Sequence, residues 1–129
     1  MDSKTVQVGK DELRIVIEQY LSDFDEEENE HIFKCLKEGG KFAKKRVKEL
    51  SPKRTGDYAN GWTMRTKRRK GRIEVVVYNA KAPGLTHLLE KGHVVHKKSG
   101  DDRSEPIPHI STAQEEAEEY TLDLLVRGL

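Results

Sequence analysis

Residues 61–79, GWTMRTKRRKGRIEVVVYN, decide the fold of this chain. In each half of the stretch, over residues 62–67 and 73–78, two sets of side chains alternate at a period of two, which is typical of β-strands. The basic turn Arg68-Arg69-Lys70-Gly71 joins the halves, and Gly71 supplies the positive φ angle that such a turn often requires. The stretch therefore predicts an antiparallel β-hairpin.

Before the hairpin, apolar residues recur every three or four positions, which is the spacing of an amphipathic helix. The pattern predicts one helix over residues 10–23 and a longer one over residues 25–50, which Pro52 ends. Gly39-Gly40 lies inside the longer helix at a cost of about 1 kcal/mol per glycine relative to alanine, so either a kink or a tight contact is implied. Residues 1–9 are polar and aperiodic, and we expect a flexible arm.

After the hairpin, the chain alternates between short helical patterns and polar stretches. Leucines over residues 85–89 predict a short helix that Gly92 stops. The polar stretch 93–108 predicts a long mobile loop. Ser111 or Thr112 is expected to cap a closing helix with an approximate apolar face.

Together these elements predict an α+β fold. A small antiparallel β-sheet with a central basic hairpin would be packed by a long N-terminal helix and a C-terminal helix. The length of 129 residues suits one domain, 1–129. Hydrophobic residues make up 34% of the chain, so the core is thin and we expect part of the apolar surface to be buried against neighbouring subunits.

The same composition limits the expected location of the chain in the cell and the chemistry that it can support. No apolar run approaches the roughly 20 residues of a membrane-spanning helix, and the N-terminus lacks the pattern of a signal peptide. We therefore expect a soluble chain that stays in the cytoplasm. The single cysteine, Cys35, excludes an intramolecular disulfide and any zinc site built on several cysteines.

Charge is strongly segregated although the formal net charge is only +1. Residues 11–30 carry one basic and nine acidic side chains, residues 41–72 thirteen basic and two acidic, and residues 111–129 one basic and five acidic. Two acidic ends thus flank a basic middle. Such a distribution can steer an anionic partner to one face or orient one subunit against the next.

The sequence predicts no catalytic, cofactor or metal site, and hence no enzyme. The four histidines between positions 87 and 109 lack the spacing of a helical metal pair, so we interpret them as solvated or hydrogen-bonded. Cys35 lies beside Leu36 on the long helix and is expected to be a small buried or half-buried thiol. The carboxylates of residues 26–30 and 115–119 are consecutive rather than paired around a pocket, which favours a solvated or interface helix face.

Nucleic-acid binding is the more serious candidate because basic residues gather on the hairpin. They are Arg65, Lys67, Arg68, Arg69, Lys70 and Arg72. A basic ribbon can contact phosphates without base specificity, but apart from Trp62 it lacks aromatic stacking platforms. The alternative is a solubilising hairpin tip or a salt-bridging surface against an acidic neighbour.

Four short motifs, in order, resemble a known family. They are the segments 51–58 (SPKRTGDY), 77–79 (VYN), 87–93 (HLLEKGH) and 106–110 (PIPHI). This series resembles the tail-component family of tailed bacteriophages, the small neck and tail-completion proteins encoded between the head and tail genes. The resemblance covers residues 30–125, and Ser111-Thr112-Ala113 departs from it where a Pro-Ala pair is common. Each motif can be explained by a structural role, as a turn, a helix end or a stiff segment before the last helix.

The resemblance implies a structural virion protein at the head-tail interface, without catalytic residues. Its copies would form a hexameric or dodecameric ring around the DNA channel, joining head-closure or connector proteins to tail tube or tail terminator proteins. The subunit would be assembled in the host cytoplasm and lie in the virion neck or tail. Contacts with an adjacent ring, or non-specific contacts with DNA in the channel, would fall to Arg65, Lys67, Arg68, Arg69, Lys70, Arg72, Lys97 and Lys98. A small basic nucleic-acid-binding module is the alternative.

Overall fold

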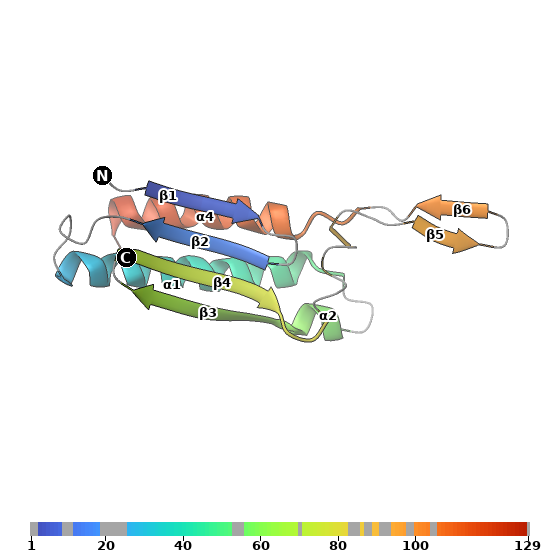
Figure 1. The fold of residues 1–129 in the computed structure, drawn as a ribbon, viewed down its shortest axis with the longest axis horizontal. Coiled ribbons are helices and arrows are strands. Elements are labelled where there is room, and N and C mark those ends of the chain that lie inside the picture. Colours follow the sequence, from blue (N-terminus) through green and yellow to red (C-terminus); the bar gives the residue numbers. More distant parts are fainter. Residues whose placement is uncertain are drawn as a thin grey trace.

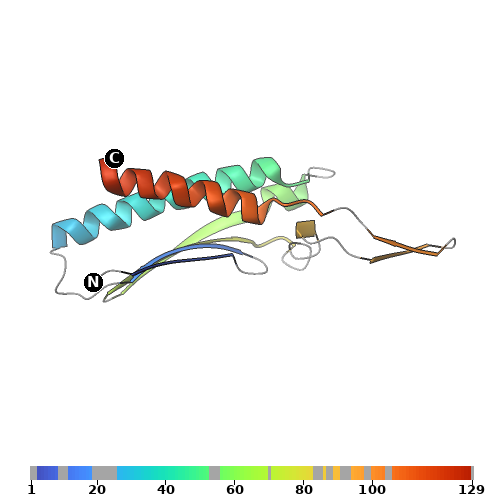
Figure 2. The same ribbon diagram turned by 90° about the horizontal axis from the view of Figure 1, so that it is seen from above.

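The structure is a computed structural model of the chain. It describes residues 3–8, 12–18, 26–52, 56–69, 71–82, 86, 89–90, 94–97, 100–103 and 106–128. The fold has two layers, a β-sheet on one side and two long helices on the other (Figures 1 and 2).

The predicted hairpin is confirmed and forms half of the sheet. Strands β3 (Trp62–Arg69) and β4 (Arg72–Asn79) pair antiparallel, with Arg69 opposite Arg72 at the turn. Gly71 has a φ angle of 74°, as the turn requires. β4 lies in the interior of the sheet because β2 (Glu12–Glu18) pairs with its other edge. With β1 (Ser3–Val8) beside β2, the four-stranded order is β1-β2-β4-β3.

Strands β1 and β2 stand where the sequence predicted a flexible arm and a helix. The helix predicted over residues 10–23 is wrong over Glu12–Glu18, which is strand β2. Leu13, Ile15 and Ile17 are buried at a period of two and lie opposite the valines and isoleucine of β4. Their pairing with a buried strand outweighs the three- and four-residue spacing that also fits this segment. Residues 19–25 lie outside the described residues.

The predicted arm over residues 1–9 is also wrong where the structure describes it. Ser3–Val8 forms strand β1, paired antiparallel with β2. Val6 and Val8 are the only apolar residues of the segment, too few to predict a strand by themselves, and the strand is defined by its pairing along the edge of β2.

Two antiparallel helices cover one face of the sheet, as predicted. α1 (Glu26–Leu50) and α4 (Ile110–Arg127) run side by side in both views (Figures 1 and 2). The first turn of α1 carries Glu26, Glu27 and Glu28, whose charge favours the positive end of the helix dipole. A four-residue helix, α2 (Asp57–Asn60), lies between α1 and the sheet, just before the predicted hairpin.

Gly39 and Gly40 mark a tight contact rather than a kink, since α1 continues unbroken through them. A Cβ atom at Gly39 would overlap Oγ1 of Thr121 on α4, and one at Gly40 would overlap Val75 and lie 2.6 Å from Sδ of Met64. The glycine pair therefore lets α1 approach both the other helix and the sheet. The core between the layers consists chiefly of Leu13, Ile15, Ile17, Ile32, Leu36, Ala43, Val47, Trp62, Ile73, Val75, Val77, Ile110, Ala113 and Ala117.

The region between the sheet and α4 is only partly as predicted. Thr86, Leu89 and Glu90 are helical, as the predicted short helix requires, whereas Gly92 lies outside the described residues. The loop predicted over residues 93–108 is wrong, because β5 (Val94–Lys97) and β6 (Gly100–Arg103) form an antiparallel hairpin. This hairpin extends away from the two-layer body as an arm (Figures 1 and 2).

Candidate functional site

The basic residues of β3 divide between the two faces of the sheet. β3 is an edge strand, and its side chains alternate between the helix layer and the open face. Arg65, Lys67 and Arg69 are exposed on the open face. Arg65 lies 5.0 Å from the ring centre of Tyr78, and no described carboxylate forms an ion pair with any of the three. Of the predicted contact residues whose side chains the structure describes, these three are available to a partner.

Arg68 points the other way and is held by α1. Its guanidinium donates a hydrogen bond of 2.7 Å to Glu30 and lies 4.5 Å from the ring centre of Phe33. The hydrogen bond from Arg68 is the main reason why the pKa of Glu30 is lowered. Arg68 is therefore better explained as a clamp between sheet and helix than as a contact for DNA.

Arg72 is likewise engaged within the chain, in an ion-pair network on the open face. It contacts Glu18, and its guanidinium lies 3.0 Å from Glu74, which also accepts from Arg14 at 3.2 Å. Burial raises the pKa of Glu74, but the hydrogen bond from Arg72 and the charges of Arg14, Arg72 and Lys67 outweigh it, so the pKa is lowered. The network neutralises the centre of this face and leaves the β3 edge positive.

The other three predicted contact residues are Lys70, Lys97 and Lys98. Lys97 lies in β5, on the projecting arm (Figure 1). Lys70 and Lys98 lie outside the described residues.

A second basic surface, which we call the lysine ridge, runs along the solvent side of α1. Its residues are Lys34, Lys37, Lys41, Lys44, Lys45 and Lys48. Sequence reasoning did not single out this surface, although the spacing of three and four residues already places the lysines on one face of the helix. Arg46, from the same run, faces α4 instead and lies 2.6 Å from Glu116.

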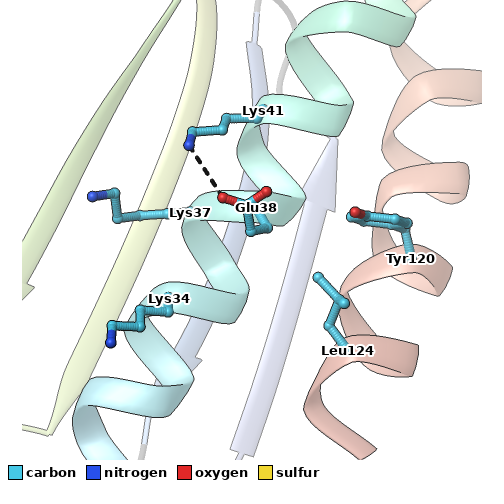
Figure 3. A pocket seen from close by; sticks show the side chains of 6 residues that line it. All are labelled: Lys34, Lys37, Glu38, Lys41, Tyr120 and Leu124. Atoms are coloured by element: carbon cyan, nitrogen blue, oxygen red, sulfur yellow. Dashed lines mark hydrogen bonds and ion pairs between the residues drawn. The ribbon is translucent and has the colours of Figure 1, made fainter. Parts of the chain in front are cut away.

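An open groove lies between the start of this ridge and α4 (Figure 3). Its volume is about 440 Å³, and it is lined by Lys34, Lys37, Glu38, Lys41, Tyr120 and Leu124. Lys41 lies 3.1 Å from Glu38, whereas neither Lys34 nor Lys37 has an ion-pair partner in the described part of the chain. Tyr120 stacks on Phe42, with ring centres 4.6 Å apart. The groove combines cations with an apolar wall.

The four motifs that carry the family resemblance meet at one end of the fold, around a buried carboxylate. Glu90 accepts hydrogen bonds from the backbone N–H groups of His109, Ile110 and Ser111 and from the Ser111 hydroxyl, at 2.6–3.1 Å. It thereby caps α4, which the sequence assigned to Ser111 or Thr112. Burial raises the pKa of Glu90, but these hydrogen bonds outweigh it, so the pKa is lowered.

An aromatic and polar cluster stands beside this cap. His109 is fully buried and its Nδ1 donates to the carbonyl of Ile107 at 2.7 Å, while Nε2 lies 2.6 Å from the Tyr58 hydroxyl. Trp62 packs edge-on against both rings and donates to Ser51. Each polar group is used in holding the chain together. We therefore assign these motif residues to architecture, as the motifs suggested.

Asn79 of the VYN motif joins the same end of the fold. Its amide donates to the carbonyl of Tyr58 at 2.8 Å and accepts from the backbone N–H groups of Lys81 and Ala82. The side chain is 2% exposed and so fixes the exit of β4 against α2. Sequence reasoning found the motif but could not place this contact.

The remaining reactive groups are structural in character. Cys35 is fully buried, as predicted, and burial raises the pKa of its thiol. Among the residues that the structure describes, no group of three or more His, Cys, Asp or Glu side chains could hold a metal ion. No helix in the described part of the chain is long and apolar enough to cross a membrane.

These features define a small two-layer α+β protein with charged outer surfaces. The family described as "Bacteriophage HK97-gp10, putative tail-component" matches residues 15–92. The chain belongs to this family of bacteriophage tail components, so the predicted family is confirmed, although the match begins at residue 15 rather than 30 and ends before the motif at 106–110. The matched segment spans β2, α1, the β3–β4 hairpin and Glu90. No curated protein and no solved structure shows a significant match.

Proposed function

We propose that this tail component is a non-enzymatic structural subunit at the head-tail interface, where its copies form a ring around the DNA channel. The observation that carries the proposal is the exposed cationic edge of β3, formed by Arg65, Lys67 and Arg69. On the sheet, Arg14, Arg68 and Arg72 are paired with carboxylates, whereas these three cations are paired with no described carboxylate. In a ring, such an edge meets either packaged DNA or an acidic surface of the adjoining ring. A hexamer or dodecamer in the virion neck or tail, assembled in the host cytoplasm, is the form we propose.

The proposal is tested by measuring the mass of the purified chain by light scattering. The measurement is made alone and after mixing with the neighbouring head-closure and tail proteins of the same genome, at low and moderate salt. We expect a discrete oligomer or a stoichiometric complex. A monomer that engages none of these proteins but binds nucleic acid in a salt-sensitive way would instead support a small basic nucleic-acid-binding module.

Charge reversal of the β3 edge gives the first prediction. Replacing Arg65, Lys67 and Arg69 by glutamate is expected to lower particle infectivity roughly tenfold or more, because like charges in a contact cost over 1.4 kcal/mol. The measurement is plaque titre after complementation of a phage that lacks this gene.

The matched control keeps the charges. Arg65→Lys with Arg69→Lys should leave infectivity near that of the wild type, because the contact depends on positive charge rather than on guanidinium geometry. Normal titres for the charge-reversed chain would contradict a functional role of this edge.

A further inference from the structure

α4 presents an outward ridge that nothing in the described part of the chain covers. It consists of Glu115, Glu119, Leu122 and Val126, at spacings of four, three and four residues. Leu122 is 48% exposed and Val126 is 78% exposed, and no described cation pairs with either glutamate. This spacing is that of a seam along which one helix packs on another. We call this set the α4 ridge.

The groove between α1 and α4 has the complementary chemistry. Tyr120 and Leu124 form an apolar wall on α4, and Lys34 and Lys37 border the other side of the groove with their ammonium groups turned away from α4 (Figure 3). Glu38 lies between these lysines and Tyr120 and is paired with Lys41 at 3.1 Å, so the lining keeps an excess of positive charge (Figure 3). The groove therefore suits an acidic helix that also carries apolar side chains.

One copy cannot fill its own groove with its own ridge. On α4, Thr121 is buried against Gly39 of α1, and Tyr120 and Leu124 flank this contact. Each residue advances 100° around the helix. Glu119 and Leu122 therefore lie up to about half a turn away from Tyr120 and Leu124, on the side of α4 that is turned to solvent. The ridge and the groove thus face different directions, and only a second molecule can bring them together.

We propose that the α4 ridge of one copy docks in the α1–α4 groove of the next copy. Glu115 and Glu119 would lie against Lys34 and Lys37, and the apolar half of the ridge against Tyr120 and Leu124. The acidic and apolar halves of the ridge follow one another along about 16 Å of helix, at 1.5 Å per residue, so the ridge would lie across the groove, from α4 to the lysines of α1.

The contact joins two different surfaces, so it repeats from copy to copy and closes a ring when the rotation allows. It rests on the proposed ring and names the surfaces that build it. Nucleic acid on the lysines is the competing occupant. We favour a second copy because the lysines adjoin an apolar wall, and the exposed Leu122 and Val126 need an apolar partner that a phosphate backbone does not provide.

Disulfide trapping between two full-length variants tests the contact. In a Cys35→Ala background, one chain carries Leu122→Cys and the other Leu124→Cys. We expect a cross-linked dimer under mild oxidation only when both chains are mixed. Cross-linking of the Leu122→Cys chain with itself alone would show like-to-like packing of α4 and overturn the proposal, and so would the absence of any cross-link.

Exchanging the charges between the two surfaces is the second test of the contact. Glu115→Lys with Glu119→Lys in the Leu122→Cys chain should lower the yield of dimer roughly tenfold. Adding Lys34→Glu with Lys37→Glu to the Leu124→Cys partner should restore most of it. Failure of the restoration, with unchanged circular dichroism, would overturn the pairing of these charges.

Two outcomes separate this proposal from the proposed function. A ring of defined mass without the cross-link would keep the head-tail role and reject this interface. Loss of DNA binding by Lys34→Glu with Lys37→Glu, while Glu115→Lys with Glu119→Lys leaves assembly unchanged, would show that the lysines serve nucleic acid and would also reject it.

Discussion

Glu90→Gln is expected to lower the free energy of unfolding by about 2–4 kcal/mol, because it removes a buried charge from the N-terminus of α4. The carboxylate accepts four hydrogen bonds, three of them from backbone N–H groups that have no partner within the helix. A glutamine keeps one accepting oxygen but turns its NH₂ group towards the donors of Ser111. Urea unfolding followed by circular dichroism measures the change.

Glu115→Gln is the matched control, since Glu115 is an exposed carboxylate on α4, the helix that Glu90 caps. It should change the free energy of unfolding by about 0.5 kcal/mol or less. Equal effects of the two substitutions would show that the Glu90 cap contributes nothing beyond surface charge.

The Glu90 cap also predicts a pH dependence. The pKa of Glu90 is lowered from 4.5, so its contribution to stability is complete above that value and is lost as the pH falls through the folded-state pKa. The difference in free energy of unfolding between the wild type and Glu90→Gln should therefore shrink as the pH falls below 4.5. A difference that stays constant between neutral and strongly acidic pH would contradict an ionised cap.

Gly39→Ala is expected to destabilise the fold by about 1–3 kcal/mol, although alanine is the better helix former. The added Cβ would overlap the Thr121 hydroxyl and lie 3.0 Å from its Cβ, so the two helices must separate. Thermal or urea unfolding checks the sign. Helix propensity alone would stabilise the variant by about 1 kcal/mol, and that result would contradict the close contact.

A double-mutant cycle with Thr121→Ala isolates the contact. Removing the hydroxyl and methyl of Thr121 takes away the overlapping atom, so Gly39→Ala should cost less in the Thr121→Ala background. Lys45→Ala, on the exposed side of α1, serves as the control for helix propensity. Equal costs of Gly39→Ala in both backgrounds would show that Thr121 does not set the distance between the helices.

The sequence predicted elements whose pattern is local and strong. Alternating side chains and Gly71 predict the β3–β4 hairpin. A long apolar stripe that ends at Pro52 predicts α1. The double glycine was correctly linked to close packing as one of two options. Its partner, Thr121, lies about 80 residues away and could only come from the structure.

The missed elements depend on partners that periodicity does not show. β2 contains Leu13, Val16 and Ile17 at a spacing that fits a helix, and only its pairing with β4 fixes it as a strand. β1 has only two apolar residues and is defined by its pairing with β2. The β5–β6 hairpin was hidden by polar composition, because Gly100 and its neighbours suggest a turn rather than the start of a strand.

The candidate surfaces were found in outline only. A run of basic letters in residues 65–72 indicated a charged ribbon, but alternation sends Arg68 to α1 and Arg72 to carboxylates and leaves Arg65, Lys67 and Arg69 exposed. The capping role of Glu90 was missed because its donors follow it by about 20 residues. The motif HLLEKGH pointed to Glu90 without showing what it binds.

The central claim, that this tail component joins heads to tails, is tested most directly by electron microscopy of particles made without it. A phage carrying a stop codon in this gene is grown in a non-suppressing host, and the lysate is imaged with and without the wild-type chain supplied from a plasmid. We predict DNA-containing heads and separate tails in its absence, and joined, infectious particles when the chain is supplied. Complete tailed particles in the absence of the chain would contradict the account.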